Sequence, residues 1–192
     1  EEYVRHEASR ALRFLTDNKT ISKLTSMLTY PSSPLQLEGA IRAIAETEDP
    51  QYASIVASFA GDPNSAVRVA VAFCLGKTDP ITNIRLLVRM LTDDDWKVRE
   101  EAKRSVHKCI QVPDVEGEIP RQPAGKKMPA VEVEQIALPM LKEAYANGKI
   151  PQADALLHFC KGEKSIPVLL DIYRDKKSHP TRFEYHDRMG KL

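Results

Sequence analysis

Apolar side chains recur along residues 1–110 with the spacing of amphipathic helices. Four segments align with one another, and they begin at Val4, Gln36, Val67 and Val98, so that successive starts differ by 32, 31 and 31 residues. Within each segment the core positions fall at offsets 0, 4, 7 and 8, which is the spacing of one face of an α-helix. The pattern therefore predicts a helix that recurs in the same register along the chain.

A second set of apolar positions lies between these segments and repeats with the same period. It reads Ile21, Leu24, Thr25 and Leu28, then Tyr52, Ile55, Val56 and Phe59, then Ile84, Leu87, Val88 and Leu91. Each period then contains two antiparallel helices, which we name helix A and helix B in chain order. A single pair cannot bury its own apolar face, so the pairs are expected to stack on one another.

A charged pair of residues marks the turn and the start of helix B. Asp62 lies six residues before Arg68, and Asp93 lies six residues before Arg99. An Asp in the turn and an Arg early in helix B, at this spacing, resemble the HEAT repeat, especially its short bacterial lyase-type form. The resemblance implies an all-α fold, a right-handed α-solenoid of antiparallel helix pairs. It also implies that these four residues form a ladder of bonds between adjacent repeats, and we expect Asp93 and Arg99 to bond across repeats in a partly buried position.

The period divides the chain into three parts of one continuous solenoid. Residues 1–110 carry it clearly, although Tyr30 and Gln36 occupy the two ladder positions of the second helix B, where the ladder should break. Residues 111–130 contain four prolines and two glycines, which predict a long inserted loop. Residues 131–192 predict further, divergent helix pairs.

The first helix after the loop contains a proline. It is expected over residues 131–147, with Pro139 in its interior, where the missing N–H should kink the helix. Its apolar stripe is predicted to consist of Ile136, Met140, Leu141 and Ala144.

Charge argues against nucleic acid as the partner. The chain has 28 Lys and Arg and 27 Asp and Glu, and residues 1–110 contain 15 of each sign. Phosphate binding needs a clear basic excess. A HEAT-like DNA glycosylase would also need aromatic side chains on its binding surface, whereas the one Trp, Trp96, is expected to pack against a turn. A nucleic-acid-binding HEAT-like protein is therefore kept only as an alternative to protein binding.

The three cysteines are expected to be reduced and buried. Cys74, Cys109 and Cys160 are far apart, odd in number and placed in apolar helical patterns, so neither a disulfide nor a metal spacing is present. This usage favours the cytoplasm. No apolar run is long enough for a membrane helix. Because the sequence begins without Met and within a helical pattern, we expect it to be part of a longer chain.

Motifs for catalysis are missing from the sequence. His6 and Glu7 form one His-Glu pair, whereas HEAT-type iron enzymes bind two irons through several such pairs. The other four histidines form no HxxxH or HExxH spacing, and no phosphate loop or nucleophile elbow occurs. We therefore predict no catalytic residue, no metal and no cofactor, and an enzyme or enzyme subunit of the HEAT-like bilin lyase kind remains the alternative.

One row of the B helices is the candidate binding site. Offset 6 points away from the core and carries Arg10, Arg42, Phe73 and Arg104. Glu38 and Glu100 stand four residues before two of these arginines, so one interpretation is a solvated face with helical ion pairs. The other is a binding ridge on the concave face, where arginines and one aromatic ring contact a partner. We predict a scaffold or adaptor that binds another protein or peptide, preferably an acidic one.

Overall fold

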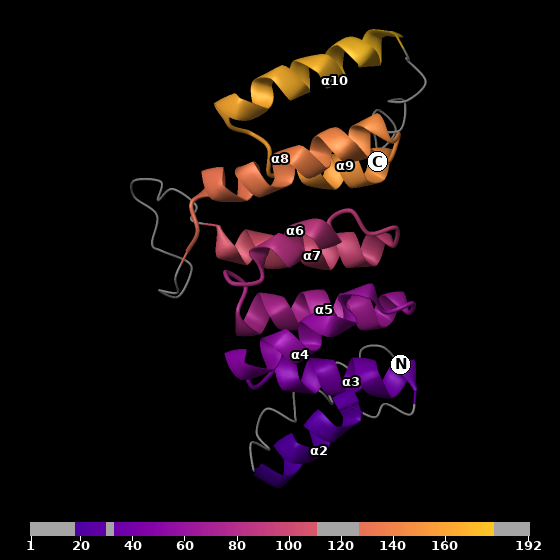
Figure 1. The fold of residues 1–192 in the computed structure, drawn as a ribbon, viewed down its shortest axis with the longest axis vertical. Helices are drawn as coiled ribbons and strands as arrows, with labels where there is room; N and C mark the ends of the chain where they lie inside the picture. Colours follow the sequence, from indigo (N-terminus) through magenta and orange to yellow (C-terminus); the bar gives the residue numbers. More distant parts are fainter. Residues whose placement is uncertain (1–17, 30–32, 111–126, 179–192) are drawn as a thin grey trace, which may run out of the picture.

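The computed structural model describes residues 18–29, 33–110 and 127–178, and over these ranges the protein is an all-α solenoid (Figure 1). Its α-helices are α2 (Asn18–Thr29), α3 (Pro34–Ala45), α4 (Ala53–Ala57), α5 (Ser65–Thr78), α6 (Ile84–Met90), α7 (Trp96–Cys109), α8 (Ala130–Ala146), α9 (Ile150–Leu157) and α10 (Ile166–Ser178). Short 3-10 turns are η2 (Pro50–Tyr52), η3 (Ser58–Gly61) and η4 (Glu163–Ser165). The helices follow one another from α2 at one end of the stack to α10 at the other.

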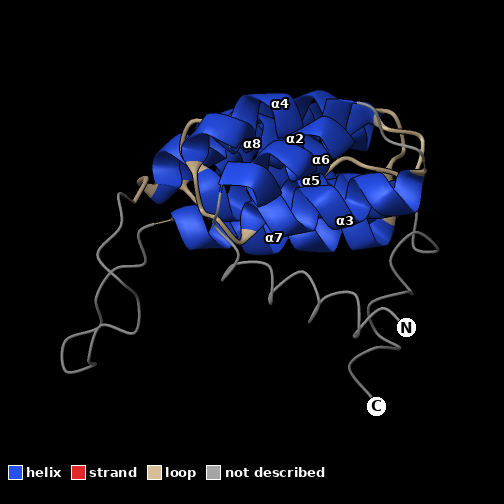
Figure 2. Ribbon diagram, turned by 90° about the horizontal axis from the view of Figure 1, so that it is seen from below, coloured by secondary structure: helices blue, strands red, loops and turns tan. Residues whose placement is uncertain are grey.

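The helices lie in two layers, which Figure 2 shows edge on. Helices α2, α4, α6 and α8 form one layer, which we call the A layer. Helices α3, α5 and α7 form the other, the B layer, and α9 extends it by packing on α7. Helix α5 packs on both α3 and α7 and is therefore the central element of the B layer.

The B helices begin at regular intervals because the same kind of turn precedes each of them. They start at Pro34, Ser65 and Trp96, which are 31 residues apart in both steps. Each start is capped by a side-chain oxygen of the preceding residue, which accepts a backbone N–H of the first turn: Ser33 from Gln36, Asn64 from Ala66, and Asp95 from Lys97. Over the described residues, α3, α5 and α7 thus follow a period of 31 residues.

The predicted core positions of α5 are buried. Val67, Val71, Cys74 and Leu75 are 0% exposed, so the offsets 0, 4, 7 and 8 do face the neighbouring helices. The preceding A segment is less regular than expected, since α4 is short and lies between η2 and η3. Val56 is fully buried there, whereas Tyr52, Ile55 and Phe59 pack against the core while remaining partly exposed.

A short backbone contact joins the end of α7 to the segment that precedes α8. Ile110 and Met128 form an isolated parallel β-bridge, and the N–H of Met128 donates to the carbonyl of Cys109 at 2.7 Å. Most of the predicted 111–130 loop lies outside the described residues, as do the first B helix with Arg10 and the last predicted helix. The division at residues 110 and 131 therefore stays a proposal.

The predicted apolar stripe of α8 was partly wrong. Leu141 and Ala144 are buried as expected, but the other core positions are Val133 and Ala137. Ile136 and Met140 are only partly buried and lie at the edge of the core. The helix continues through Pro139 without ending there. A shift of one residue turns a side chain by about 100° around a helix, so the buried face is displaced from the predicted one.

A buried carboxylate attaches the turn after α9 to α8. Glu134 of α8 accepts hydrogen bonds from the N–H of Gly162, at 3.1 Å, and from the hydroxyl of Ser165. Both Glu134 and Ser165 are buried, so their polar groups satisfy each other away from water. This contact fixes the turn that leads into α10.

Candidate functional site

Phe73 occupies the middle of the central B helix and is surrounded by cations from three helices. Its ring is partly buried against the core. The guanidinium carbon of Arg42 lies 5.7 Å from the ring centroid, and the Nζ atoms of Lys77 and Lys108 lie 5.5 Å and 6.0 Å from it. All three distances are within the range of a cation–π interaction. We call Phe73, Arg42, Lys77 and Lys108 the Phe73 cluster.

Two of these cations are also held by buried acids. Arg42 Nε donates to Glu38 Oε1 at 3.0 Å, and the two side chains are only 13% and 10% exposed. Lys77 Nζ lies 2.9 Å from a carboxylate oxygen of Glu46 in the cap of α3, so this ion pair links neighbouring repeats. These acids fix the cations in place, and they also neutralise them.

The α7 side of the surface is more open and less neutralised. Arg104 is 64% exposed and lies 3.7 Å from Glu100 and 3.5 Å from Glu101, so its ion pairs are long. Lys108 is exposed, and within the described residues no carboxylate forms an ion pair with it. This part of the B layer therefore carries positive charge that the described acids neutralise only in part.

The structure brings together only part of the predicted row. Arg42 and Phe73 are in contact, whereas the contacts of Arg104 are with the acids of its own helix. Arg10 lies outside the described residues. Sequence reasoning missed Lys77 and Lys108, although each stands four residues after a member of the row and so shares its helix face.

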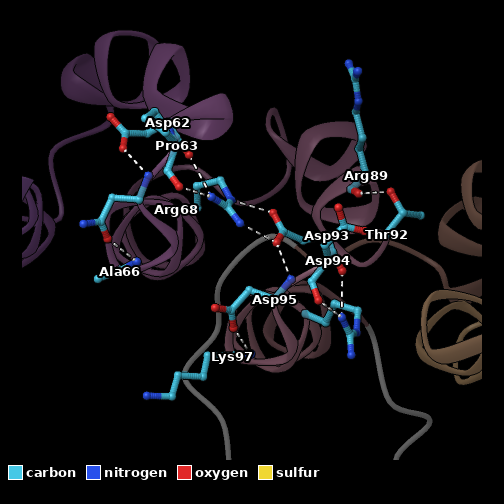
Figure 3. Close-up of polar contacts among 12 residues, drawn as sticks. Asp62, Pro63, Ala66, Arg68, Arg89, Thr92, Asp93, Asp94, Asp95 and Lys97 are labelled. Atoms are coloured by element: carbon cyan, nitrogen blue, oxygen red, sulfur yellow. Dashed lines mark hydrogen bonds and ion pairs between the residues drawn. The ribbon is translucent and has the colours of Figure 1, made fainter.

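The ladder between repeats is centred on one bidentate ion pair (Figure 3). Nε and Nη2 of Arg68, in α5, donate to the two carboxylate oxygens of Asp93, in the turn before α7, at 2.7 and 2.8 Å. Nη1 of Arg68 donates to the carbonyls of Asp62 and Pro63 in its own turn. The hydrogen bond to Asp93 raises the pKa of Arg68 above its already high value. Arg68 therefore connects two successive turns.

The expected pairing of Asp93 with Arg99 was wrong. Arg99 Nη1 donates to the main-chain carbonyls of Asp93 and Asp94, at 2.7 and 2.9 Å, and not to the Asp93 carboxylate. With the spacing of six residues, each Arg donates to backbone carbonyls of its own turn. The carboxylate of Asp93 accepts hydrogen bonds from Arg68 of the preceding repeat. At the next junction Gln152 of α9 donates to Asp94, at 3.2 Å.

The break in the ladder has a simple origin. Because α3 starts 31 residues before α5, Leu37 and not Gln36 stands where α5 has Arg68. Leu37 is buried, and its side chain has no hydrogen-bond donor. The Asp62 carboxylate accepts the N–H of Asn64 within its turn. The α3–α5 junction is instead linked at the other end of the helices by Glu46 and Lys77.

Two exposed histidines, one on α7 and one directly after α9, lie beside each other. The ring centroids of His107 and His158 are 4.6 Å apart in an edge-to-face arrangement, and Phe159 lies 5.0 Å from His107. Burial, and next the neighbouring His158, lower the pKa of His107. Burial and the nearby Lys161 lower the pKa of His158. Both rings therefore favour the neutral form and act as a packing contact.

The three cysteines lie in surroundings that do not favour reactivity. Cys74, Cys109 and Cys160 are buried, and burial raises the pKa of Cys74 to about 12 and of the other two to about 11. Thiols of this kind are poor nucleophiles at neutral pH.

The described residues contain no cluster of three or more side chains that could bind a metal ion. Trp96, which was expected to pack against its turn, is 64% exposed.

Comparison with known proteins agrees with the geometry of the central repeats. Residues 32–106, which span α3 to most of α7, match the family model of HEAT repeats. Searches of the curated proteins and of the solved structures found no match. No described helix combines the length and the apolar character that a membrane span requires.

Proposed function

We propose that this chain, which resembles the HEAT-repeat family through residues 32–106, is a scaffold that binds another protein or peptide through its B layer. HEAT repeats generally serve as scaffolds for protein interactions. The observation that carries the proposal is the Phe73 cluster, in which one aromatic ring in the central helix lies beside cations of three successive repeats. We expect this layer to be the concave face of the solenoid.

The chemistry of the cluster favours an acidic segment as the ligand. Aromatic rings and arginines contribute most of the binding energy in many interfaces. Lys108 and Arg104 add charge that the described acids neutralise only in part. A carboxylate of the partner would find a cation on α7, while an apolar side chain next to it could pack on the Phe73 ring. Arg42 and Lys77, already paired, would mainly hold the ring in position.

The proposal predicts that Phe73→Ala weakens partner binding by at least about tenfold, because each 1.4 kcal/mol of lost contact energy corresponds to a factor of about ten. The partner is first recovered by affinity capture and identified by mass spectrometry. Its dissociation constant is then measured by calorimetry with the wild type, with Phe73→Ala, and with Lys108→Ala, for which a smaller loss is expected.

Phe59→Ala is the matched control for this measurement. Phe59 is also half-buried, but it lies in η3 after α4 of the A layer, so its loss should change the dissociation constant by less than about twofold. Circular dichroism checks that all variants are folded. If Phe73→Ala and Lys108→Ala both bind the partner as tightly as the wild type does, the Phe73 cluster is not the binding site.

A further inference from the structure

The A layer contains a groove that the proposed B-layer site does not use. It lies between α6 and α8 and has a volume of about 480 Å³. Leu86 of α6 and Ile136, Pro139 and Met140 of α8 provide its apolar surface, and Arg85 and Arg89 flank it on the α6 side. This volume is within the general range of ligand-binding pockets in proteins.

The α8 wall of the groove consists of apolar residues at the edge of the core. Ile136 and Met140 are four residues apart on one face of α8 and remain only partly buried. Pro139 lies between them on α8 and also lines the groove. This wall therefore offers mainly apolar contacts to a ligand.

The two arginines give the groove its charge preference. Arg85 and Arg89 are exposed and stand four residues apart on α6, and within the described ranges neither forms an ion pair. Like charges at this spacing repel each other and destabilise a helix. A carboxylate bound between the two guanidiniums would remove this repulsion and form charge-assisted hydrogen bonds.

We infer that the groove between α6 and α8 is a second docking site, which binds a short acidic segment of a partner protein. The segment places a large apolar side chain against Leu86, Ile136 and Met140, and places one or two carboxylates against Arg85 and Arg89. The charge of Arg85 and Arg89 favours an acidic segment, whereas the apolar surface alone would bind many kinds of peptide. The site lies on the layer opposite the Phe73 cluster, so one chain could hold two partners at the same time.

A random-peptide display library, selected on the folded chain, is the probe that tests this inference. Enriched peptides are labelled with fluorescein, and their affinities are measured by fluorescence polarisation. We expect peptides in which Asp or Glu accompanies a bulky apolar residue. Their affinity should fall at least about tenfold in the double variant Arg85→Glu/Arg89→Glu, and should stay within about twofold in Arg104→Glu, whose arginine is exposed on the B layer.

A charge swap separates recognition from a change in folding. Peptides whose acids are replaced by Lys should lose affinity for the wild type and regain it with Arg85→Glu/Arg89→Glu. The inference is overturned if no enriched peptide loses affinity in the double variant. It is also overturned if Phe73→Ala lowers the affinity of the peptides instead. It is also overturned if sedimentation shows a dimer that the double variant dissociates, because the occupant would then be a second copy of this chain.

Discussion

Asp93→Ala is expected to lower the free energy of unfolding by about 1–3 kcal/mol, the range for removing a charged hydrogen-bond partner. The Asp93 carboxylate accepts both guanidinium hydrogen bonds of Arg68 and also the N–H of Asp95, at 2.8 Å. The Asp93 and Arg68 side chains are only 13% and 16% exposed, so water can replace these bonds only in part. The substitution thus loosens the turn before α7 and its attachment to α5.

A double-mutant cycle identifies the partner of Asp93. Chemical denaturation of Asp93→Ala, Arg68→Ala and the double variant should give a coupling energy of about 1 kcal/mol or more. Arg99→Ala is the matched control, because its guanidinium contacts the carbonyl of Asp93 and not the carboxylate. A cycle with Arg99 should therefore give a much smaller coupling. Additive effects of Asp93→Ala and Arg68→Ala would show that the ladder is not formed.

Gly76→Ala is expected to destabilise the protein by about 2–3 kcal/mol, although Ala is the better helix former. A Cβ atom at Gly76 would lie 2.2 Å from Oγ, 2.6 Å from Cβ and 3.2 Å from Cα of Ser105. Ser105 is buried in α7 and donates a hydrogen bond to the carbonyl of Ala72 at 2.9 Å, so its side chain is held in place. To accommodate the Ala side chain, α5 and α7 would have to move apart.

The cause of this loss can be tested with a second substitution and a control. Adding Ser105→Gly to Gly76→Ala removes the atoms that clash, so the double variant should be more stable than the sum of the single effects predicts. A Cβ atom added at Gly39, in α3, would meet nothing within 4 Å, so Gly39→Ala should be neutral or stabilise by up to about 1 kcal/mol. Equal losses at both glycines in denaturation experiments would contradict the close-approach explanation.

The helix register could be predicted from sequence because it depends on local features. The capping residues Asn64 and Asp95 recur with the period of the apolar positions, so the turns and the helix starts carry the same information. The buried stripe of α5 followed from the same spacing. The stripe of α8 was partly missed, because apolar residues there line the core on one side and the groove on the other.

The partners of the charged residues could not be predicted in the same way. Asp93 has an Arg six residues later in its own repeat and another in the repeat before, and the spacing alone does not choose between them. Asp93 pairs with Arg68 because the packing of α5 brings the Arg68 side chain next to the turn that contains Asp93. The Phe73 cluster was found only in part for a related reason, since Lys108 approaches the ring of a neighbouring helix.

Site-specific photo-cross-linking tests most directly whether the B layer binds the partner. p-Benzoylphenylalanine is placed at position 108 in one variant, beside Phe73, and at position 54 in another, where the exposed Ser54 lies on α4 of the A layer. Irradiation of the complex with the captured partner should give a covalent adduct from position 108 and none from position 54. An adduct from position 54 alone would contradict the account, because the partner would then contact the A layer instead of the Phe73 cluster.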